Sequence, residues 1–318
     1  MYARSIALLA LLVTTGAFAQ NYPQKTIRFL VGYTPGGTAD ILARAVGAKM
    51  SETWGHPVVV ENRPGAGTNI ASEIGAHAAP DGYTLFMPTV ANVINVTLYP
   101  KLNYDLIRDF AHVTNIATVP GIVVVHPSVP VKDIKELVAF AKAHPNQLRH
   151  GSTGIGSPHH LAAELFKTMT GVKMVHIPYK GAAPAITDIV GGHIEVYFGA
   201  FVSTIPQVRN GRLRALAVTS LKRVSVAPEI PTLDEQGLKG FETGSWFGVS
   251  VPTGTPRPIV DKLHDEVVRA IALPDIRDRM MAEGATFVGD TPEQFTAYIK
   301  SDIVKWGKAV KVSGARPE

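Results

Sequence analysis

The stretch 148-LRHGSTGIGSPHHLAAELF-166 joins a glycine-rich turn to the start of a helix. Its turn holds three glycines and three hydroxyl side chains in close succession: Gly151, Ser152, Thr153, Gly154, Gly156 and Ser157. Ser157 followed by Pro158 is typical of an N-cap and the first helical residue. The N–H groups at a helix start lack intrahelical partners and carry partial positive charge, so they attract carboxylates and phosphates. The stretch therefore predicts an anion-binding turn between a strand and a helix.

A second stretch, 29-FLVGYTPGGTADILARAVG-47, repeats this arrangement. A strand leads into a turn at Gly36 and Gly37, and Thr38 opens a helix. We expect Asp40, in the first turn of that helix, to accept hydrogen bonds from loop N–H groups. Tyr33 either covers the ligand or packs beneath it. Two helix starts that face each other would hold a small anion from both sides.

The chain alternates short apolar strands with amphipathic helices, which is typical of an α/β fold with largely parallel sheets. Its length of 318 residues suits two domains better than one. The predicted strands are 26–31, 58–61, 83–87, 122–125, 172–177, 194–198, 213–219 and 245–251. The predicted helices are 38–53, 68–79, 131–143, one from 157, 183–190, 202–209, 228–237, 256–273, 274–283 and one from 291.

Loops rich in Gly, Pro, Thr and Asn follow three of the early strands. In open α/β sheets the ligand lies beyond the carboxyl ends of the strands, so these loops are predicted to line one wall of a cleft. Thr89 and Asn92 are candidate ligand contacts. Asn69 either contacts the ligand or fastens its own loop. Lys180, in a turn, either supplies a cation or is solvated.

Composition and the N-terminus exclude several functions. Lys and Arg number 31 against 26 Asp and Glu, a net charge of +5, without a basic run, so nucleic acid is not an expected partner. No cysteine is present, which excludes disulfides and thiolate catalysis. Arg4, the apolar run 5–13 and Ala17-Phe18-Ala19 predict a signal peptide over 1–19, cleaved after Ala19.

Motifs of catalysis and of cofactor binding fail in detail. Neither Ser152 nor Ser157 has the flanking glycines of a hydrolase nucleophile. His159 and His160 are adjacent, so on a helix they point about 100° apart, which does not suit a zinc site. The glycines at 65–67 lack the third glycine of a dinucleotide fingerprint, and the glycine-rich turn lacks a P-loop lysine. We therefore expect no catalytic residue, no metal and no cofactor.

Six motifs in a fixed order resemble the Bug family, the periplasmic solute receptors of tripartite tricarboxylate transporters. They cover nearly the whole chain after the predicted signal peptide: YTPGGTAD (33–40), ENRPGAGTNI (61–70), PDGYTL (80–85), GSTGIGSPHH (151–160), PYKGAAPA (178–185) and GGHIEV (191–196).

This resemblance implies a type II periplasmic-binding-protein fold, with two lobes joined by two crossings near 120–125 and 246–251 and a ligand cleft between them. Domain 1 would comprise 20–121 and 249–318, and domain 2 would comprise 122–248. The implied function is to capture a small carboxylate in the periplasm, either a di- or tricarboxylate or an aromatic acid, and to pass it to membrane permease subunits of a tripartite tricarboxylate transporter. Two alternatives stay open: a periplasmic enzyme that uses His159 or His160, and a sensor that reports the solute to a membrane kinase.

The resemblance also implies that main-chain N–H groups and ordered waters hold the ligand carboxylate. Carried onto this sequence, the binding residues are Tyr33, Gly36, Gly37, Thr38, Ser152, Thr153, Gly154, Gly156, Ser157 and His159. Two departures matter. The family often has Ser-Gln-His where this chain has Pro158-His159-His160, and often an Asp that can meet a ligand ammonium where this chain has Gly199 and Ala200. The resemblance therefore implies a ligand without an ammonium group.

Overall fold

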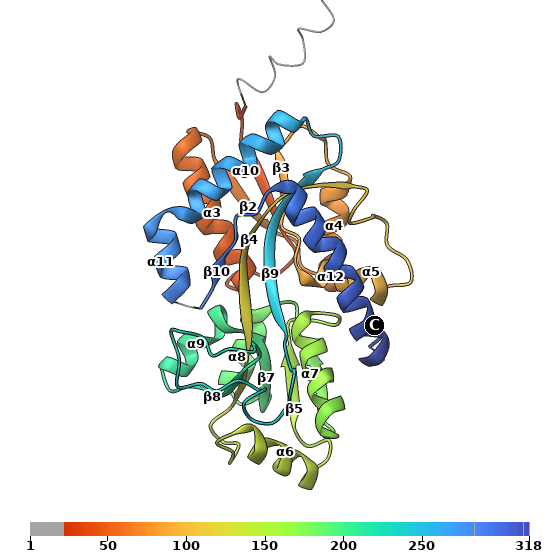
Figure 1. The fold of residues 1–318 in the computed structure, drawn as a ribbon, viewed down its shortest axis with the longest axis vertical. Helices are drawn as coiled ribbons and strands as arrows, with labels where there is room; N and C mark the ends of the chain where they lie inside the picture. Colours follow the sequence, from red (N-terminus) through yellow and green to blue (C-terminus); the bar gives the residue numbers. More distant parts are fainter. Residues whose placement is uncertain (1–21, 283, 314, 318) are drawn as a thin grey trace, which may run out of the picture.

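The computed structural model describes residues 22–282, 284–313 and 315–317, so the predicted signal peptide lies outside the described part. Figure 1 shows an elongated molecule in which an upper and a lower group of elements are joined by two long strands. These strands are β4 (Phe110–Val125) and β9 (Gly244–Pro252). Within the described residues, no helix has both the length and the apolar character needed to cross a membrane.

The upper group is built on strands in the order β2-β1-β3-β9-β4. β1 (Ile27–Val31) runs parallel to β2 (Val58–Asn62) and to β3 (Thr84–Phe86), whereas β9 is antiparallel to β3 and β4. The short β10 (Thr286–Phe287) pairs with β4. The helices of this group are α3 (Thr38–Trp54), η1 (Ala66–Thr68), α4 (Asn69–Ala76), α5 (Val90–Leu98), α10 (Arg257–Ala272), α11 (Pro274–Ala282) and α12 (Pro292–Ser313).

The lower group continues the sheet from the far end of β4 in the order β4-β7-β5-β6. β5 (Arg149–Ser152) is parallel to β6 (Val175–Pro178) and to β7 (Val196–Ala200), and β8 (Arg214–Val218) pairs with β4. The helices of this group are α6 (Ile134–Ala143), α7 (Pro158–Thr170), α8 (Ala182–Val190) and α9 (Phe201–Arg209). The predicted α/β alternation is thus observed in both groups.

β4 changes partners in its middle. Pro120 pairs with Gly244 of β9, and the next residue, Gly121, pairs with Ala200 of β7. The upper part of β4 therefore belongs to one sheet and its lower part to the other. The point of change lies at the predicted crossing, while the predicted domain boundaries stay a prediction.

The last helix packs along the crossing strands. Phe295 and Ile299 of α12 are fully buried, as their spacing predicts. Trp246 of β9 donates from its indole Nε1 to the Oδ2 of Asp302 over 2.7 Å, and both side chains are buried. A buried N–H is satisfied by this bond, so α12 is held against β9 at one defined position.

Several elements differ from the sequence predictions, and three of them have a clear physical reason. The segment 228–237 is not a helix, because Thr232 bridges Val218 of β8 and the Leu233 N–H donates to the Val218 carbonyl. The segment 91–97, for which the sequence predicts neither helix nor strand, lies in helix α5, and its Asn92 and Asn95 side chains find partners on neighbouring loops. β4 begins twelve residues before the predicted strand, because buried polar residues interrupt the apolar pattern there. Two of them are hydrogen-bonded through their side chains: His112 Nδ1 to Ser250 Oγ and Thr114 Oγ1 to the Asp290 carbonyl.

Candidate ligand site

Five helices begin around one small inner pocket of about 30 Å³. In the order α3, α5, α7, α8 and α9, the residues at their starts that line it are Gly37, Thr38, Ala39, Thr89, Val90, Pro158, His159, Ala182 and Ala200. No Asp or Glu of the described chain lines this pocket. Because each helix start carries partial positive charge, the pocket favours a negatively charged group.

Three of these helices start without a capping side chain. The N-cap positions of α3, α8 and α9 are Gly37, Gly181 and Ala200, and none makes a side-chain cap hydrogen bond. By contrast, Ser157 caps α7, since its hydroxyl oxygen accepts from the N–H of His160 over 3.1 Å. The uncapped starts leave main-chain N–H groups to be satisfied by water or a ligand.

Thr38 adds a polar atom without a partner to the inner pocket. Its side chain is 4% exposed, and its Oγ1 makes no hydrogen bond within the described residues. A buried hydroxyl left without a partner costs about 1–3 kcal/mol. An acceptor bound in the pocket would remove that cost.

Asp40 holds the loop before α3 in place, as the sequence predicts. Its Oδ2 accepts from the N–H of Gly36 over 2.9 Å, and its Oδ1 accepts from Nδ2 of Asn62 over 3.0 Å. Burial acts to raise the pKa of Asp40, but hydrogen bonds from Arg44, Gly36 and Asn62 outweigh it and lower the pKa. The ionised carboxylate thus serves the loop as a fixed acceptor.

A larger outer cavity of about 360 Å³ adjoins the inner pocket, and Tyr33 and Thr153 line both. Residues from both groups of elements line the outer cavity: Gly32, Tyr33, Gly65, Ala66, Gly67, Thr68, Ala91 and Tyr99 from the upper group, and Thr153, Gly154, Ile155, Ser157, Pro178, Tyr179 and Lys180 from the lower group. A volume of this size suits a small ligand enclosed between two surfaces.

One wall of the outer cavity is a strained turn. Gly65, Ala66, Gly67 and Thr68 have positive φ angles of 132°, 47°, 61° and 81°. For Ala66 and Thr68 this backbone region is unfavourable, and strain of this kind collects at ligand-binding sites. Asn95 supports the turn, because its Nδ2 donates to the Gly67 carbonyl over 2.7 Å.

The glycine-rich turn after β5 uses several of its predicted groups internally. The N–H of Gly154 donates to Ser152 Oγ over 3.2 Å, and the N–H of Gly156 donates to His160 Nδ1 over 3.1 Å. Ser152 Oγ also contacts His176 Nε2 over 2.7 Å. These bonds set the shape of the turn and direct both amides toward the protein.

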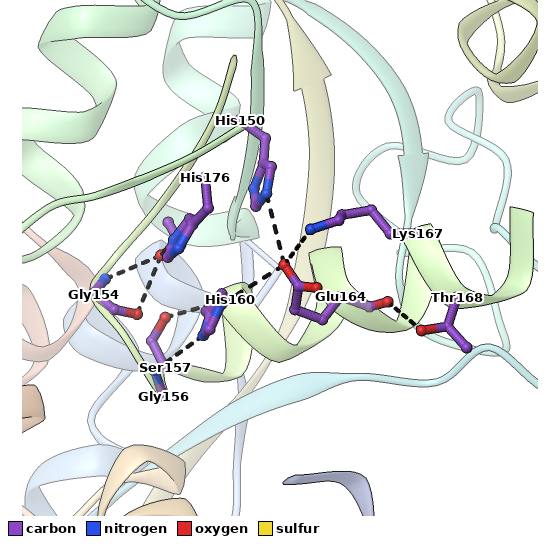
Figure 2. Close-up of polar contacts among 10 residues, drawn as sticks. His150, Gly154, Gly156, Ser157, His160, Glu164, Lys167, Thr168 and His176 are labelled. Carbon is purple, nitrogen blue, oxygen red and sulfur yellow. Dashed lines mark hydrogen bonds and ion pairs between the residues drawn. The ribbon is translucent and has the colours of Figure 1, made fainter. Parts of the chain in front are cut away.

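Three histidines stack behind this turn, as Figure 2 shows. The rings of His160 and His176 lie 4.1 Å apart at an angle of 9°, and those of His150 and His176 lie 4.9 Å apart at 18°. Glu164 Oε1 lies 3.9 Å from His150 Nε2, 3.7 Å from His160 Nε2 and 2.7 Å from the Lys167 ammonium. Among the described residues, no group of three or more His, Cys, Asp or Glu side chains is arranged to hold a metal ion.

Burial keeps this stack neutral. It lowers the pKa of His176 to about 3, assisted by the nearby charges of His160 and Lys167. It also lowers the pKa of His150 and of His160, although Glu164 acts to raise the latter. The turn therefore rests on uncharged imidazoles at neutral pH.

His159 does not belong to the histidine stack and instead lines the inner pocket. Its Nδ1 lies 2.8 Å from Thr153 Oγ1, and its Nε2 lies 3.5 Å from Ser245 Oγ. Burial lowers its pKa to about 4, so the ring is neutral at neutral pH. A neutral imidazole held in this way can orient the Thr153 hydroxyl toward a ligand.

The structure gathers most of the predicted site residues. Those lining the inner pocket are Tyr33, Gly37, Thr38, Thr89, Thr153 and His159, and those lining the outer cavity are Tyr33, Thr153, Gly154 and Ser157. Five predicted residues line neither space: Gly36, Asn69, Asn92, Ser152 and Gly156. Their contact with a ligand stays a prediction.

Two of these five have clear structural roles. Asn69 Oδ1 accepts from Asn95 and from Tyr104, each over 2.8 Å, which fastens its loop. Asn92 is fully buried and joins the Thr89 N–H to Thr68 and Ser72.

Sequence reasoning missed several lining residues. Ala182 and Ala200 carry no polar side chain, and only their position at helix starts brings them to the site. In the sequence, the strained turn is indicated only by the glycines within 65–67.

Residues 42–314 match the sequence model of a protein family described as the tripartite tricarboxylate transporter family receptor. The chain belongs to this receptor family. The resemblance to Bug proteins is confirmed by Protein BugT of Bordetella pertussis, which is 32% identical over 98% of this chain and 98% of its own length. The family is one of periplasmic solute-binding receptors, so the recognition drawn from the six motifs holds.

Solved structures of related receptors share the fold. Rpa4515 of R. palustris, solved with adipate, is 35% identical, with a TM-score of 0.90 over 93% of this chain and 100% of that one. MatC of Rhodopseudomonas palustris, solved with bound malate, is 32% identical, with a TM-score of 0.86 over 91% of this chain and 100% of that one. The receptor therefore has the predicted α/β periplasmic-binding-protein fold.

Proposed function

We propose that this receptor captures a small carboxylate in the periplasm, after cleavage of its signal peptide behind Ala19, and delivers it to permease subunits of a tripartite tricarboxylate transporter. One observation carries the proposal: five helix starts and the unpartnered Thr38 hydroxyl surround a pocket that no acidic side chain of the described chain lines. The related receptors solved with adipate and malate hold carboxylates, which supports this ligand class.

Closure of two domains accounts for how such a ligand is held. We assign residues 20–121 and 249–318 to one domain and 122–248 to the other. The loops of the two contact each other around the site: a Cβ on Gly37 would lie 3.5 Å from Ala182 Cβ, and one on Gly67 would lie 3.3 Å from the Ile155 carbonyl oxygen. A ligand that touches α3 and α7 at once binds the closed form more tightly and so shifts the population toward it.

Binding without catalysis fits the engagement of the two candidate catalytic histidines. His159 Nδ1 is occupied by Thr153 Oγ1, and His160 Nδ1 accepts the Gly156 N–H. Both rings are buried with lowered pKa values, which makes each a weak base. The geometry favours a receptor over an enzyme.

A thermal-shift screen tests the ligand class. The protein from Gln20 onward would be unfolded, refolded to remove carried-over ligand, and mixed with mono-, di- and tricarboxylates, aromatic acids and amino acids. Ligand at 100 times its Kd stabilises the folded state by about 2.7 kcal/mol. A shift with carboxylates, and no product after incubation, is expected. No shift with any carboxylate would overturn the proposal.

Introducing a negative charge at the helix starts tests where the ligand binds. Thr38→Asp and Ser157→Asp each place a fixed anion beside the proposed carboxylate, so calorimetry should detect no binding to either variant. Asp is also a good N-cap residue, which preserves the start of α7. Unchanged affinity in both variants would place the ligand elsewhere.

A further inference from the structure

We propose that Lys180 recognises a second carboxylate of the ligand in the outer cavity, so that the receptor selects dicarboxylates over monocarboxylates. This inference rests on the proposed function, because it assumes that the first carboxylate occupies the inner pocket. It adds a specificity-determining residue and narrows the substrate class.

The charge of the outer cavity is positive. Lys180 is the only charged residue among the described residues that line it. The Lys180 side chain is exposed and forms no ion pair or hydrogen bond with the described chain. By contrast, Lys167 of α7 is paired with Glu164 over 2.7 Å. An ammonium without a partner at a cavity wall is available to an anionic ligand group.

The main chain places Lys180 at the seam between the two parts of the molecule. Its carbonyl oxygen accepts from the Thr34 N–H over 3.2 Å. The following residue, Gly181, has φ +138°, and a Cβ there would lie 2.6 Å from Thr34 Oγ1. The glycine thus allows the two loops to approach, and their contact brings Lys180 to the cavity when the cleft is closed.

The inner pocket and the outer cavity form one continuous path for a ligand. Tyr33 and Thr153 line both the inner pocket and the outer cavity. A ligand whose first carboxylate meets the helix starts therefore extends past these two residues into the outer cavity. Lys180 is the charged group that its far end meets there. Acidic side chains that would compete for Lys180 are absent from the described lining.

The hydroxyl groups of two neighbouring tyrosines have other partners, so Lys180 alone is proposed to contact the second carboxylate. The Tyr179 hydroxyl donates to Asp188 Oδ2 over 2.7 Å, so it is engaged outside the proposed contact. Tyr33 OH lies 3.3 Å from Thr89 Oγ1. The tyrosine rings can then flank an aliphatic chain while the ammonium fixes its end.

Paired ligands provide the test. Isothermal calorimetry would compare succinate, glutarate and adipate with butyrate, valerate and hexanoate, which match them in carbon number but carry one carboxylate. The proteins are the wild type, Lys180→Gln, Lys180→Arg and the control Lys142→Gln, which removes an equal charge from the exposed end of α6. Since a partly exposed ion pair contributes about 1 kcal/mol, a loss of about fivefold is expected from one such contact.

The proposal expects the wild type to bind one dicarboxylate more tightly than its monocarboxylate partner. Lys180→Gln should weaken that dicarboxylate about fivefold or more and leave the monocarboxylate unchanged, whereas Lys180→Arg and Lys142→Gln should keep the preference. Equal loss for both ligand types, or no loss, would overturn it, as would a wild type that does not prefer the dicarboxylate. Failure of the wild type to bind any carboxylate would instead refute the proposed function.

Discussion

The backbone N–H of Thr34 donates a hydrogen bond to the carbonyl oxygen of Lys180 over 3.2 Å, which joins the loop after β1 to the turn after β6. These loops belong to the upper and lower groups of elements (Figure 1). The bond is one of the direct contacts across the ligand site, and Gly181 is the residue that permits it. If the receptor closes on its ligand, this contact forms on closure.

Gly181→Ala should therefore weaken ligand binding. Its φ of +138° is strained for alanine, and the added Cβ would lie 2.6 Å from Thr34 Oγ1. Strain of about 1–3 kcal/mol in the closed form alone would reduce affinity for a bound carboxylate about tenfold, measured by calorimetry.

Gly171→Ala is the matched control for that variant. Gly171 caps the end of α7 with φ +71°, and a Cβ there meets nothing within 4 Å. It should lower the melting temperature but keep the affinity. If Gly181→Ala behaves in the same way, the contact between Thr34 and Lys180 does not contribute to closure.

Removing the Thr38 hydroxyl should reduce affinity without reducing the stability of the ligand-free protein. Thr38→Val keeps the shape and deletes an unpartnered buried hydroxyl. If that hydroxyl donates to the ligand carboxylate, the loss is about 1.5–3 kcal/mol, or at least tenfold in Kd.

Thr204→Val tests the same change away from the site. Thr204 is fully buried with an unpartnered Oγ1 and lines neither the inner pocket nor the outer cavity. The Thr204→Val variant should bind the carboxylate with wild-type affinity in calorimetry. Equal affinity of the two variants would show that Thr38 does not contact the ligand.

The receptor should prefer succinate to aspartate, which differ by one ammonium group. An ammonium near the inner pocket would face five helix starts and no carboxylate of the described lining, and the start of α9 contributes only Ala200 to that lining. Titrating both ligands into the refolded protein measures the preference. Tighter binding of aspartate would contradict the prediction.

Acidification should destabilise the receptor through its histidine stack. The folded-state pKa of His150 lies well below its usual value, chiefly through burial and then through the charges of His176, Lys167 and His160. Between about pH 6.5 and 5 the unfolded chain binds a proton that the folded chain does not, so stability falls as the pH falls. The expected loss from His150 between pH 7 and 5 is at most about 2 kcal/mol, the limit that the ordinary histidine pKa of the unfolded chain sets.

Urea unfolding at pH 7 and pH 5 measures this dependence. His150→Phe keeps an aromatic ring in the stack but cannot titrate, so it should reduce the difference in unfolding free energy between the two pH values, by up to about 2 kcal/mol. His193→Gln changes an exposed histidine and should leave the difference intact. A His150→Phe protein with the full wild-type difference would exclude this cause.

Elements governed by local rules could be predicted from the sequence. The start of α7 at Pro158 follows from Ser157 as N-cap and proline at the first helical position, and Ser157 does cap the helix. Gly36 and Gly156 were recognised as turn residues, and their φ angles are +85° and +72°. The family could also be identified, because its motifs lie in these same turns.

Long-range pairing limited the other predictions. Residues 228–237 carry a pattern compatible with a helix, but the bridge from Thr232 to Val218 decides their conformation. Likewise, the resemblance implies that Gly154 and Gly156 present N–H groups to a ligand. Ser152, held by His176 of β6, and His160 of α7 accept those N–H groups instead.

The sequence by itself determined where helices begin, which turns need glycine, and that the chain is a Bug-type receptor, because each depends on residues close together in the chain. Only the tertiary structure decided that α5, α8 and α9 begin beside α3 and α7, and that Lys180 borders the cavity they adjoin. The physical reason is that helix starts act through main-chain N–H groups. Residues such as Ala182 and Ala200 therefore line the pocket because of their position at helix starts, which their side chains do not reveal.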